Sequence, residues 1–173
     1  MKALAIRPWQ QDDLPIVREV IWKSWEATYA AFVPEADLKG YWSVHYSLQG
    51  IEKMFHDSAV DGFVAESGGR IVGCLRTRFD EIKQMFYVVS LYLLPEEQRK
   101  GIGKLLMAEA DKCATTYGLS EIWVAVMVQN QVARRWYEHL GFRFIREEPF
   151  FIGRTSVPHL VGFRKIVTGM QKP

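Results

Sequence analysis

The residues with the clearest chemical potential form one basic, glycine-containing segment in the second half of the chain. This segment, Gln98-Arg99-Lys100-Gly101-Ile102-Gly103-Lys104, joins an apolar run to an amphipathic stretch, so we expect a strand-to-helix turn. Glycines adopt positive φ and let a ligand approach the backbone closely, while the free N–H groups at a helix N-terminus favour negative charge. The segment therefore predicts a site for a phosphate or pyrophosphate group.

Two well-known phosphate-binding sequences do not fit this segment. Gly-x-x-x-x-Gly-Lys-Ser/Thr is absent, and Gly-x-Gly-x-x-Gly fails because Leu106 stands where the third glycine should be. Neither a nucleoside triphosphatase nor a dinucleotide-binding fold is therefore supported. The alternative for the turn itself is an ordinary helix start, with Arg99, Lys100 and Lys104 as solvated charges.

A second group of candidate residues lies one expected helix and one expected strand further along. Asn130 precedes a segment with Ala133, Trp136 and Tyr137 at helical spacing, which ends at Gly141. Taken alone, an asparagine here is a helix N-cap and a tyrosine on an apolar helix face is a core residue. A phenol at this place could also donate a proton in catalysis.

The elements that must position these residues begin with a mostly helical first third. Local patterns predict a strand at Leu4–Pro8, a helix capped by Asp12 or Asp13 and running to about Tyr29, a helix starting at Pro34, and further helix over Leu48–Ser58.

From Gly62 onward the pattern changes to alternating strands and helices. We expect a hairpin turning at Gly68-Gly69, a buried central strand, and helices that end at Gly118 and Gly141. The predicted strands are Gly62–Ser67, Arg70–Phe79, Met85–Leu94, Glu121–Val128, Phe142–Ile152 and Leu160–Val167, with helices over Gly103–Tyr117 and after Asn130.

Composition indicates an ordinary folded protein and sets limits on its partners. The chain has 173 residues, 49% of them hydrophobic and 24% charged, which favours a single domain over residues 1–173 and excludes a disordered chain. The net charge of +2 is too small for a dedicated nucleic-acid or membrane binder. Cys74 and Cys113 match no zinc-binding spacing, so we interpret them as reduced core thiols. With no signal-peptide or membrane-spanning pattern, we expect a cytoplasmic protein.

Together the two candidate segments resemble the GNAT superfamily of N-acetyltransferases, which use acetyl-CoA. Leu91-Tyr92-Leu93-Leu94-Pro95 followed by Gln98-x-x-Gly101-x-Gly103 resembles the family's central strand and pyrophosphate turn. Asn130-x-x-Ala133-x-x-Trp136-Tyr137-x-x-x-Gly141-Phe142 is similar to its second signature. The resemblance covers about residues 85–151. It implies an α/β fold, α+β in some schemes: a mixed, mostly antiparallel, twisted sheet of about seven strands flanked by helices, with the central strands splayed around acetyl-CoA.

The resemblance also assigns roles to individual residues. The amides from Gln98 to Lys104 would hold the CoA pyrophosphate, and the backbones of Leu91 and Leu93 would meet the pantetheine arm. The Leu93 N–H would polarise the thioester carbonyl, Asn130 would contact the cosubstrate, and Tyr137 would lie beside the sulfur. No metal is required by this scheme.

The base that must deprotonate the acceptor amine is not obvious from the sequence. Some family members place a glutamate on the central strand, but Met85–Leu94 contains no carboxylate. A water relayed by Ser90 and Tyr92 remains open, and so does a carboxylate from elsewhere in the chain. The candidates for that carboxylate are Glu26, Asp80 and Glu81, each of which is otherwise a solvated surface charge.

The acceptor pocket of this family is usually formed by the first two helices and the last strands. Candidates to bind the acceptor are thus Trp25, Glu26, Tyr29 and Tyr92, with Phe32 and residues 147–159 as further possibilities. Trp25 and Tyr29 share a helix face, which fits either core packing or an aromatic wall that, with Glu26, would suit a cationic amine. We expect a primary amine of a small molecule as acceptor. A peptide or lysine amine, a non-catalytic acyl-CoA sensor, and a plain α/β domain without CoA are the alternatives; a homodimer is a family expectation.

Overall fold

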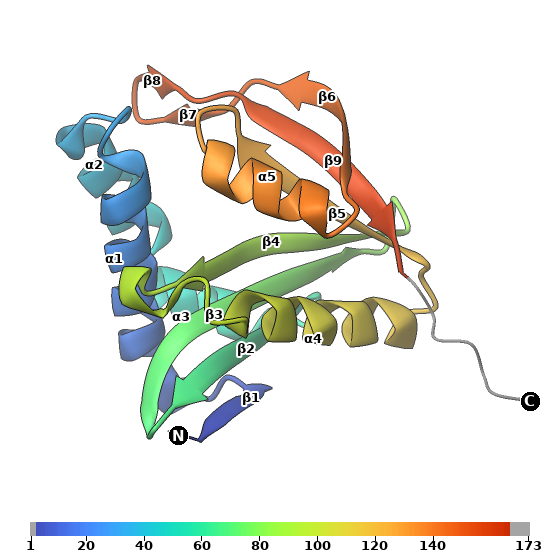
Figure 1. Cartoon of the computed structure of the whole chain (residues 1–173). Helices are drawn as coiled ribbons and strands as arrows, with labels where there is room; N and C mark the ends of the chain where they lie inside the picture. Colours follow the sequence, from blue (N-terminus) through green and yellow to red (C-terminus); the bar gives the residue numbers. More distant parts are fainter. Residues whose placement is uncertain (1–2, 167–173) are drawn as a thin grey trace, which may run out of the picture.

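A computed structural model describes residues 3–166 and contains one mixed sheet of seven strands with helices packed on it (Figure 1). The strand order is β1-β2-β3-β4-β5-β9-β6, and every neighbouring pair is antiparallel except β4 and β5. This confirms the mixed, mostly antiparallel α/β fold expected from the sequence. No helix of the described residues is long and apolar enough to cross a membrane.

The first third of the chain is helical after strand β1, as predicted, with small differences at the helix ends. The elements are β1 (Leu4–Pro8), a 3₁₀ turn (Gln11–Asp13), α1 (Leu14–Tyr29), α2 (Glu35–His45) and α3 (Leu48–Phe55). Asp13 occupies the N-cap position of α1, but its carboxylate accepts from the Arg7 guanidinium and the Gln10 N–H instead of capping the helix. Pro34 is the residue before α2 and not its first residue, and α3 ends before Ser58.

The hairpin predicted at Gly68-Gly69 is confirmed. Strands β2 (Val60–Ser67) and β3 (Arg70–Asp80) are antiparallel, and both glycines have positive φ, of 58° and 77°. The central strand β4 (Met85–Leu93) pairs with β3 along its length.

The second half contains the expected strands and helices in the expected order. They are α4 (Ile102–Thr116), β5 (Glu121–Met127), α5 (Gln131–His139), β6 (Arg143–Glu148) and β9 (His159–Lys165). Gly118 and Gly141 follow the two helices with positive φ, as a left-handed helix end requires. The predicted strand Phe142–Ile152 divides into β6 and a small separate hairpin, β7 (Phe151–Ile152) with β8 (Thr155–Ser156). Val167, the predicted end of the last strand, lies outside the described residues.

The helices cover the sheet on two sides and place the core around β3 and β4. Helix α4 packs on β2, β3 and β4, while α1 packs on β3, β4 and α3. Figure 1 shows α4 in front of these strands and α3 behind them. Fully buried side chains come from both layers and from the strands between them, among them Val17, Ile51, Leu75, Phe86 and Leu106.

Candidate active site

The candidate site lies where β4 and β5 separate. The two strands pair only at Tyr87 with Trp123 and at Val88 with Val124, so within residues 3–166 the rest of β4 has no paired strand on that side. The separation follows a β-bulge: Arg76 of β3 lies opposite Ser90 and Thr77 lies opposite Val88, which leaves Val89 without a partner. A bulge bends its strand and increases its twist, which turns β4 away from β5.

The backbone of β4 beyond the bulge presents free N–H groups to the gap. The Leu94 N–H donates to the Val72 carbonyl oxygen at 2.9 Å, which fixes the side of the strand on which β3 lies. Because these directions alternate along an antiparallel strand, the N–H groups of Leu93 and Leu91 point away from β3, toward the gap. Both groups are therefore free to bond a ligand that lies along β4.

The glycine-containing turn joins the end of β4 to α4. Gly101 is the N-cap residue of α4, with φ of 83°, and Arg99 also has a positive φ, of 61°. A positive φ in an arginine costs about 1–2 kcal/mol, and such strain gathers at functional sites. Lys100 pairs with Glu97 at 3.0 Å, whereas Arg99 and Lys104 have no carboxylate within 4 Å among residues 3–166. The turn thus keeps a net positive charge next to the free N–H groups of α4.

Gly103 connects this turn to α5 and to the end of β4. A Cβ at Gly103 would lie 3.0 Å from the Trp136 ring and 3.7 Å from the Leu93 side chain. Gly103 is therefore a packing glycine: its missing side chain lets α4, α5 and β4 meet. The predicted phosphate turn, the Leu93 backbone and the helix that carries Tyr137 consequently belong to one continuous region.

A cavity of about 420 Å³ lies along the unpaired part of β4. Of the sequence-predicted residues, Leu91, Tyr92, Asn130 and Tyr137 line it, and Trp25 and Tyr29 reach it from α1. The other residues that line it come from β3, β4, β5, β9, α2, α5 and the segments that follow α2 and β6: Tyr41, Tyr46, Arg76, Tyr87, Val88, Val89, Ser90, Ala125, Val126, Met127, Ala133, Phe150 and His159.

Asn130 and Tyr137 are held in place by α5. The Asn130 carboxamide oxygen accepts from the Ala133 N–H at 3.2 Å, so Asn130 is the helix N-cap as well as a cavity residue. Tyr137 is 8% exposed and makes an edge contact with Phe142, with ring centroids 5.3 Å apart. Burial, and to a lesser extent the neighbouring Tyr29, raises the pKa of the Tyr137 phenol. The hydroxyl therefore stays protonated at neutral pH.

Trp25 and Tyr29 serve both as core residues and as an aromatic wall. Trp25 is 4% exposed and lies within 6.4 Å of the rings of Tyr29, Tyr46 and Tyr92. Burial raises the pKa of Tyr29 to about 12 and that of Tyr92 further above its ordinary value. These phenols can relay or donate a proton, but they do not ionise at neutral pH.

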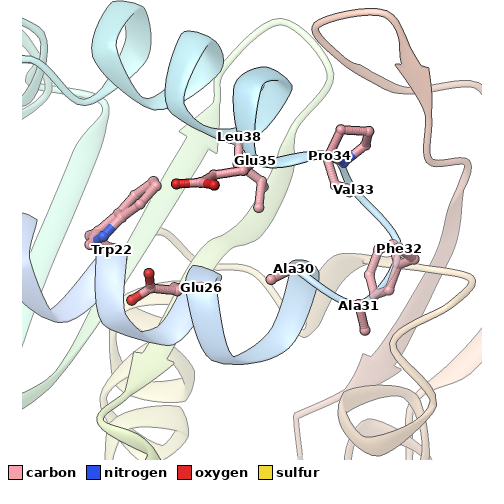
Figure 2. A pocket seen from close by; sticks show the side chains of 9 residues that line it. All are labelled: Trp22, Glu26, Ala30, Ala31, Phe32, Val33, Pro34, Glu35 and Leu38. Carbon is pink, nitrogen blue, oxygen red and sulfur yellow. The ribbon is translucent and has the colours of Figure 1, made fainter.

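Glu26 does not accompany the aromatic wall. It lines a second cavity of about 590 Å³ between α1 and the start of α2, together with Trp22 and Glu35. Figure 2 shows these three side chains at one end of that cavity and Phe32, another sequence candidate, at the other end. Successive helix residues are about 100° apart, so Glu26 faces away from the space that Trp25 borders. The carboxylate expected beside the aromatic wall is therefore missing from it.

The other two carboxylate candidates are also placed elsewhere. Asp80 ends β3 and accepts from the Lys83 N–H at 3.0 Å, and Glu81 is exposed in the turn that follows. Neither lines the 420 Å³ cavity, whereas Ser90 and Tyr92 do. Of the proton-transfer routes left open by the sequence, the hydroxyl relay is the one whose residues reach the cavity.

Sequence reasoning did not single out Arg76, and it named His159 only within a range. Arg76 interrupts an apolar stretch of β3, a signal that could have indicated an inward-facing charge. His159 stacks on Phe150, with centroids 4.3 Å apart, and burial lowers the pKa of its imidazole. Within residues 3–166, no group of three or more His, Cys, Asp or Glu side chains is placed to hold a metal ion.

The separated strand, the glycine turn and the cavity lie together, as the family resemblance led us to expect, and comparison with known proteins identifies the family. The sequence model of the acetyltransferase (GNAT) family matches residues 15–142. The spermidine N(1)-acetyltransferase of Thermoplasma acidophilum is 30% identical over 147 residues, covering 82% of this chain and 89% of that protein. The N-alpha-acetyltransferase of Sulfurisphaera tokodaii is 34% identical over 95 residues, 49% of this chain and 57% of that protein.

Solved structures show the same fold. The PaiA N-acetyltransferase of Thermoplasma acidophilum in complex with coenzyme A superposes with a TM-score of 0.82 at 24% identity, covering 94% of this chain and 99% of that one. The chain belongs to the GNAT family of acetyltransferases and is an acetyl-CoA-dependent N-acetyltransferase.

Proposed function

We propose that this enzyme transfers the acetyl group of acetyl-CoA directly to a primary amine of a small molecule. The observation that carries the proposal is the unpaired edge of β4, which runs from the turn before α4 along the 420 Å³ cavity. An extended ligand can bond that edge as an added strand would, and place its end in the cavity.

The residues present suit coenzyme A. In the proposal the amides from Gln98 to Lys104 hold the pyrophosphate, with the charges of Arg99 and Lys104 nearby. Leu91 and Leu93 offer backbone groups to the pantetheine arm, and Asn130 contacts the cosubstrate from the start of α5. The left-handed Gly101 and the close packing at Gly103 support this assignment, because they open the backbone on one side of the turn and join it to β4 on the other.

In the proposed mechanism, three side-chain hydroxyls and one backbone amide take part in the reaction. When bound, acetyl-CoA supplies an acetyl thioester. The Leu93 N–H donates to the thioester oxygen as negative charge develops on it, an effect of about 3 kcal/mol for one well-placed donor. The Tyr137 hydroxyl, kept protonated by burial, donates its proton to the departing sulfur. As the amine nitrogen bonds to the acetyl carbon and the carbon–sulfur bond breaks, Ser90 and Tyr92 relay the proton released by the amine to water, and the Tyr137 phenol regains its proton from water.

The size of the cavity favours a small acceptor. Cavities for small molecules commonly measure about 300–1,000 Å³, and 420 Å³ lies within that range. The Thermoplasma relative is named a spermidine N(1)-acetyltransferase, so polyamines are one class of acceptor to test. The Sulfurisphaera relative is named an N-alpha-acetyltransferase, so α-amino groups of peptides are another.

A thiol-release assay tests the proposal. Purified enzyme with acetyl-CoA is given small amines, polyamines and peptides, and we expect free thiol with small amines. Tyr137→Phe should lower kcat by at least about 100-fold and leave the affinity for CoA unchanged. Tyr117→Phe is the matched control, because its hydroxyl bonds Asp61 at 3.3 Å and does not line the cavity. Unchanged turnover in Tyr137→Phe would remove that residue from the mechanism.

A further inference from the structure

Arg76 brings a positive charge into the candidate acceptor cavity. It lies on β3 directly opposite Ser90 and lines the cavity. Its guanidinium donates to the Tyr46 hydroxyl at 3.4 Å and to the Met54 sulfur, and its Cζ lies 5.7 Å from the centroid of the Tyr46 ring. None of these partners carries a negative charge, and within residues 3–166 no carboxylate lies within 4 Å of the guanidinium.

Two other arginines that are partly shielded from solvent have carboxylate partners. Arg7 pairs with Asp13 and Arg164 pairs with Asp111, each at 2.7 Å, and the charge of Arg164, whose side chain is 11% exposed, is compensated in this way. Arg18 is half-buried with no carboxylate within 4 Å in residues 3–166, but its guanidinium lies on the Trp42 ring and donates to the Tyr46 carbonyl oxygen. A guanidinium that is partly withdrawn from water without a counter-charge is costly, and it binds a carboxylate strongly through two parallel hydrogen bonds. Arg76 therefore has an unused capacity for an anion.

The remainder of the cavity supplies no second charge. Its lining in residues 3–166 includes no aspartate or glutamate. The other titratable groups that line the cavity are tyrosines and one histidine: Tyr29 of α1, Tyr41 of α2, Tyr46 after it, Tyr87 and Tyr92 of β4, and His159 of β9. A diamine in this space would bring a second ammonium group to a guanidinium, with no carboxylate to neutralise either.

The cosubstrate does not provide the missing anion. Its phosphates belong at the turn before α4 in the proposed function, and its pantetheine and thioester parts are uncharged. Ser90, opposite Arg76, precedes Leu93 by three residues, which is about 10 Å along a strand. An anion at Arg76 thus has to come from the acceptor.

We propose that Arg76 binds a carboxylate of the acceptor, so that the substrates of this enzyme are amines that also carry a carboxylate group. The inference rests on the proposed function and specifies its substrate class. Tyr46 and Met54 hold the guanidinium through the Tyr46 ring and hydroxyl and the Met54 sulfur, which leaves the remaining N–H groups for the substrate. Selectivity against diamines follows from the same charge.

The test uses amines that differ only at the end remote from the reacting nitrogen. Aminovalerate, pentylamine and cadaverine share one five-carbon chain and end in a carboxylate, a methyl and an ammonium group; α-amino acids and their amides extend the set. We expect kcat/KM to be highest for carboxylates. Arg76→Met should lower it by about 10- to 100-fold for these, the value of a charged hydrogen bond, lower it much less for the amides, and leave the KM for acetyl-CoA unchanged.

Two further variants separate charge from folding. Arg76→Lys should restore part of the preference for carboxylates, and Arg78→Met, on the same strand, should behave as the wild type because Arg78 pairs with Asp57 outside the cavity. Preference of the wild type for cadaverine, or equal kinetics of Arg76→Met and wild type on carboxylates, would overturn the inference.

Binding distinguishes this inference from the proposed function. Calorimetric titration of each amine into the enzyme with CoA present measures affinity without turnover. Arg76-dependent binding of carboxylates with no thiol release would keep the inference and reject the proposed transfer. Thiol release from acetyl-CoA in the presence of amides or diamines, without binding of any amine that carries a carboxylate, would reject the inference and support the proposed acetyl transfer. Failure of every carboxylate to bind overturns the inference in either case.

Discussion

The phosphate-binding role of the turn can be tested at Gly101, because the energetic cost of a substitution there is purely conformational. Gly101 has φ of 83° and ψ of −7°, and an added Cβ would meet nothing within 4 Å. Alanine in the left-handed region costs about 1–2 kcal/mol, which lowers Tm by about 2–8 °C in a chain of this size. Gly101→Ala should therefore fold with a modestly lower Tm.

In Gly101→Ala, the affinity for coenzyme A should fall by more than the cost in stability alone would explain. The new methyl group pushes the backbone away from positive φ, so the N–H groups at the start of α4 no longer point at the same place. Loss of one N–H bond to a phosphate oxygen costs about 1.5–3 kcal/mol, so calorimetry should show an affinity for CoA lower by about 10- to 150-fold.

Gly69→Ala is the matched control. Gly69 has φ of 77°, also has nothing within 4 Å of an added Cβ, and lies in the β2–β3 hairpin, to which no part in CoA binding is assigned. It should show the same loss of Tm with unchanged affinity for CoA. If Gly101→Ala binds CoA as tightly as Gly69→Ala, the turn does not bind the pyrophosphate through its backbone, and the assignment fails.

Two pH-dependent stabilities provide independent checks of the fold around the site. The Arg7 guanidinium holds the pKa of Asp13 below its ordinary value of 3.8, so the pair stabilises the protein above that pH and less as pH falls through the lowered pKa. Asp13→Asn should reduce the free energy of unfolding at neutral pH by about 1–3 kcal/mol and flatten its acid dependence in urea titrations; an unchanged acid limb would refute this. Burial lowers the pKa of His159 below 6.5, so its contribution is present above pH 6.5 and is lost as pH falls through the lowered value. His159→Gln should remove that part of the slope, and an identical slope in both proteins would show that the imidazole is not shielded.

The turn and the helix ends around the proposed coenzyme site were predictable because their structure is determined locally. Glycine positions, a helix start and a cap are visible in a few consecutive residues, and Gly68-Gly69, Asn130 and Gly141 lie in the structure where the sequence places them. The bulge at Val89 was not predictable, because no glycine or proline marks it and its register depends on the pairing with β3. The splay of the strands was known only through the family resemblance.

The acceptor end depends on contacts that are distant in sequence, and there the predictions were less complete. Trp25, Tyr29 and Tyr92 do line the cavity, but helix rotation sends Glu26 to another surface. Arg76 was missed because it lies in the middle of a strand, whereas the candidates for the acceptor pocket were sought on helices and loops. The position of a residue across a sheet is fixed by register, which one sequence does not reveal.

The absence of a carboxylate from the lining in residues 3–166 bears directly on how the acceptor amine loses its proton. An alkyl ammonium ordinarily has a pKa near 10, and only its neutral form attacks a thioester. Burial in the cavity disfavours the ammonium form. This effect lowers the pKa of the bound amine, so that in the proposed mechanism the Ser90 and Tyr92 hydroxyls can pass its proton to water without a strong base. A glutamate at the cavity wall would act in the opposite direction, since it would hold the amine in the charged, unreactive form unless it took the proton itself.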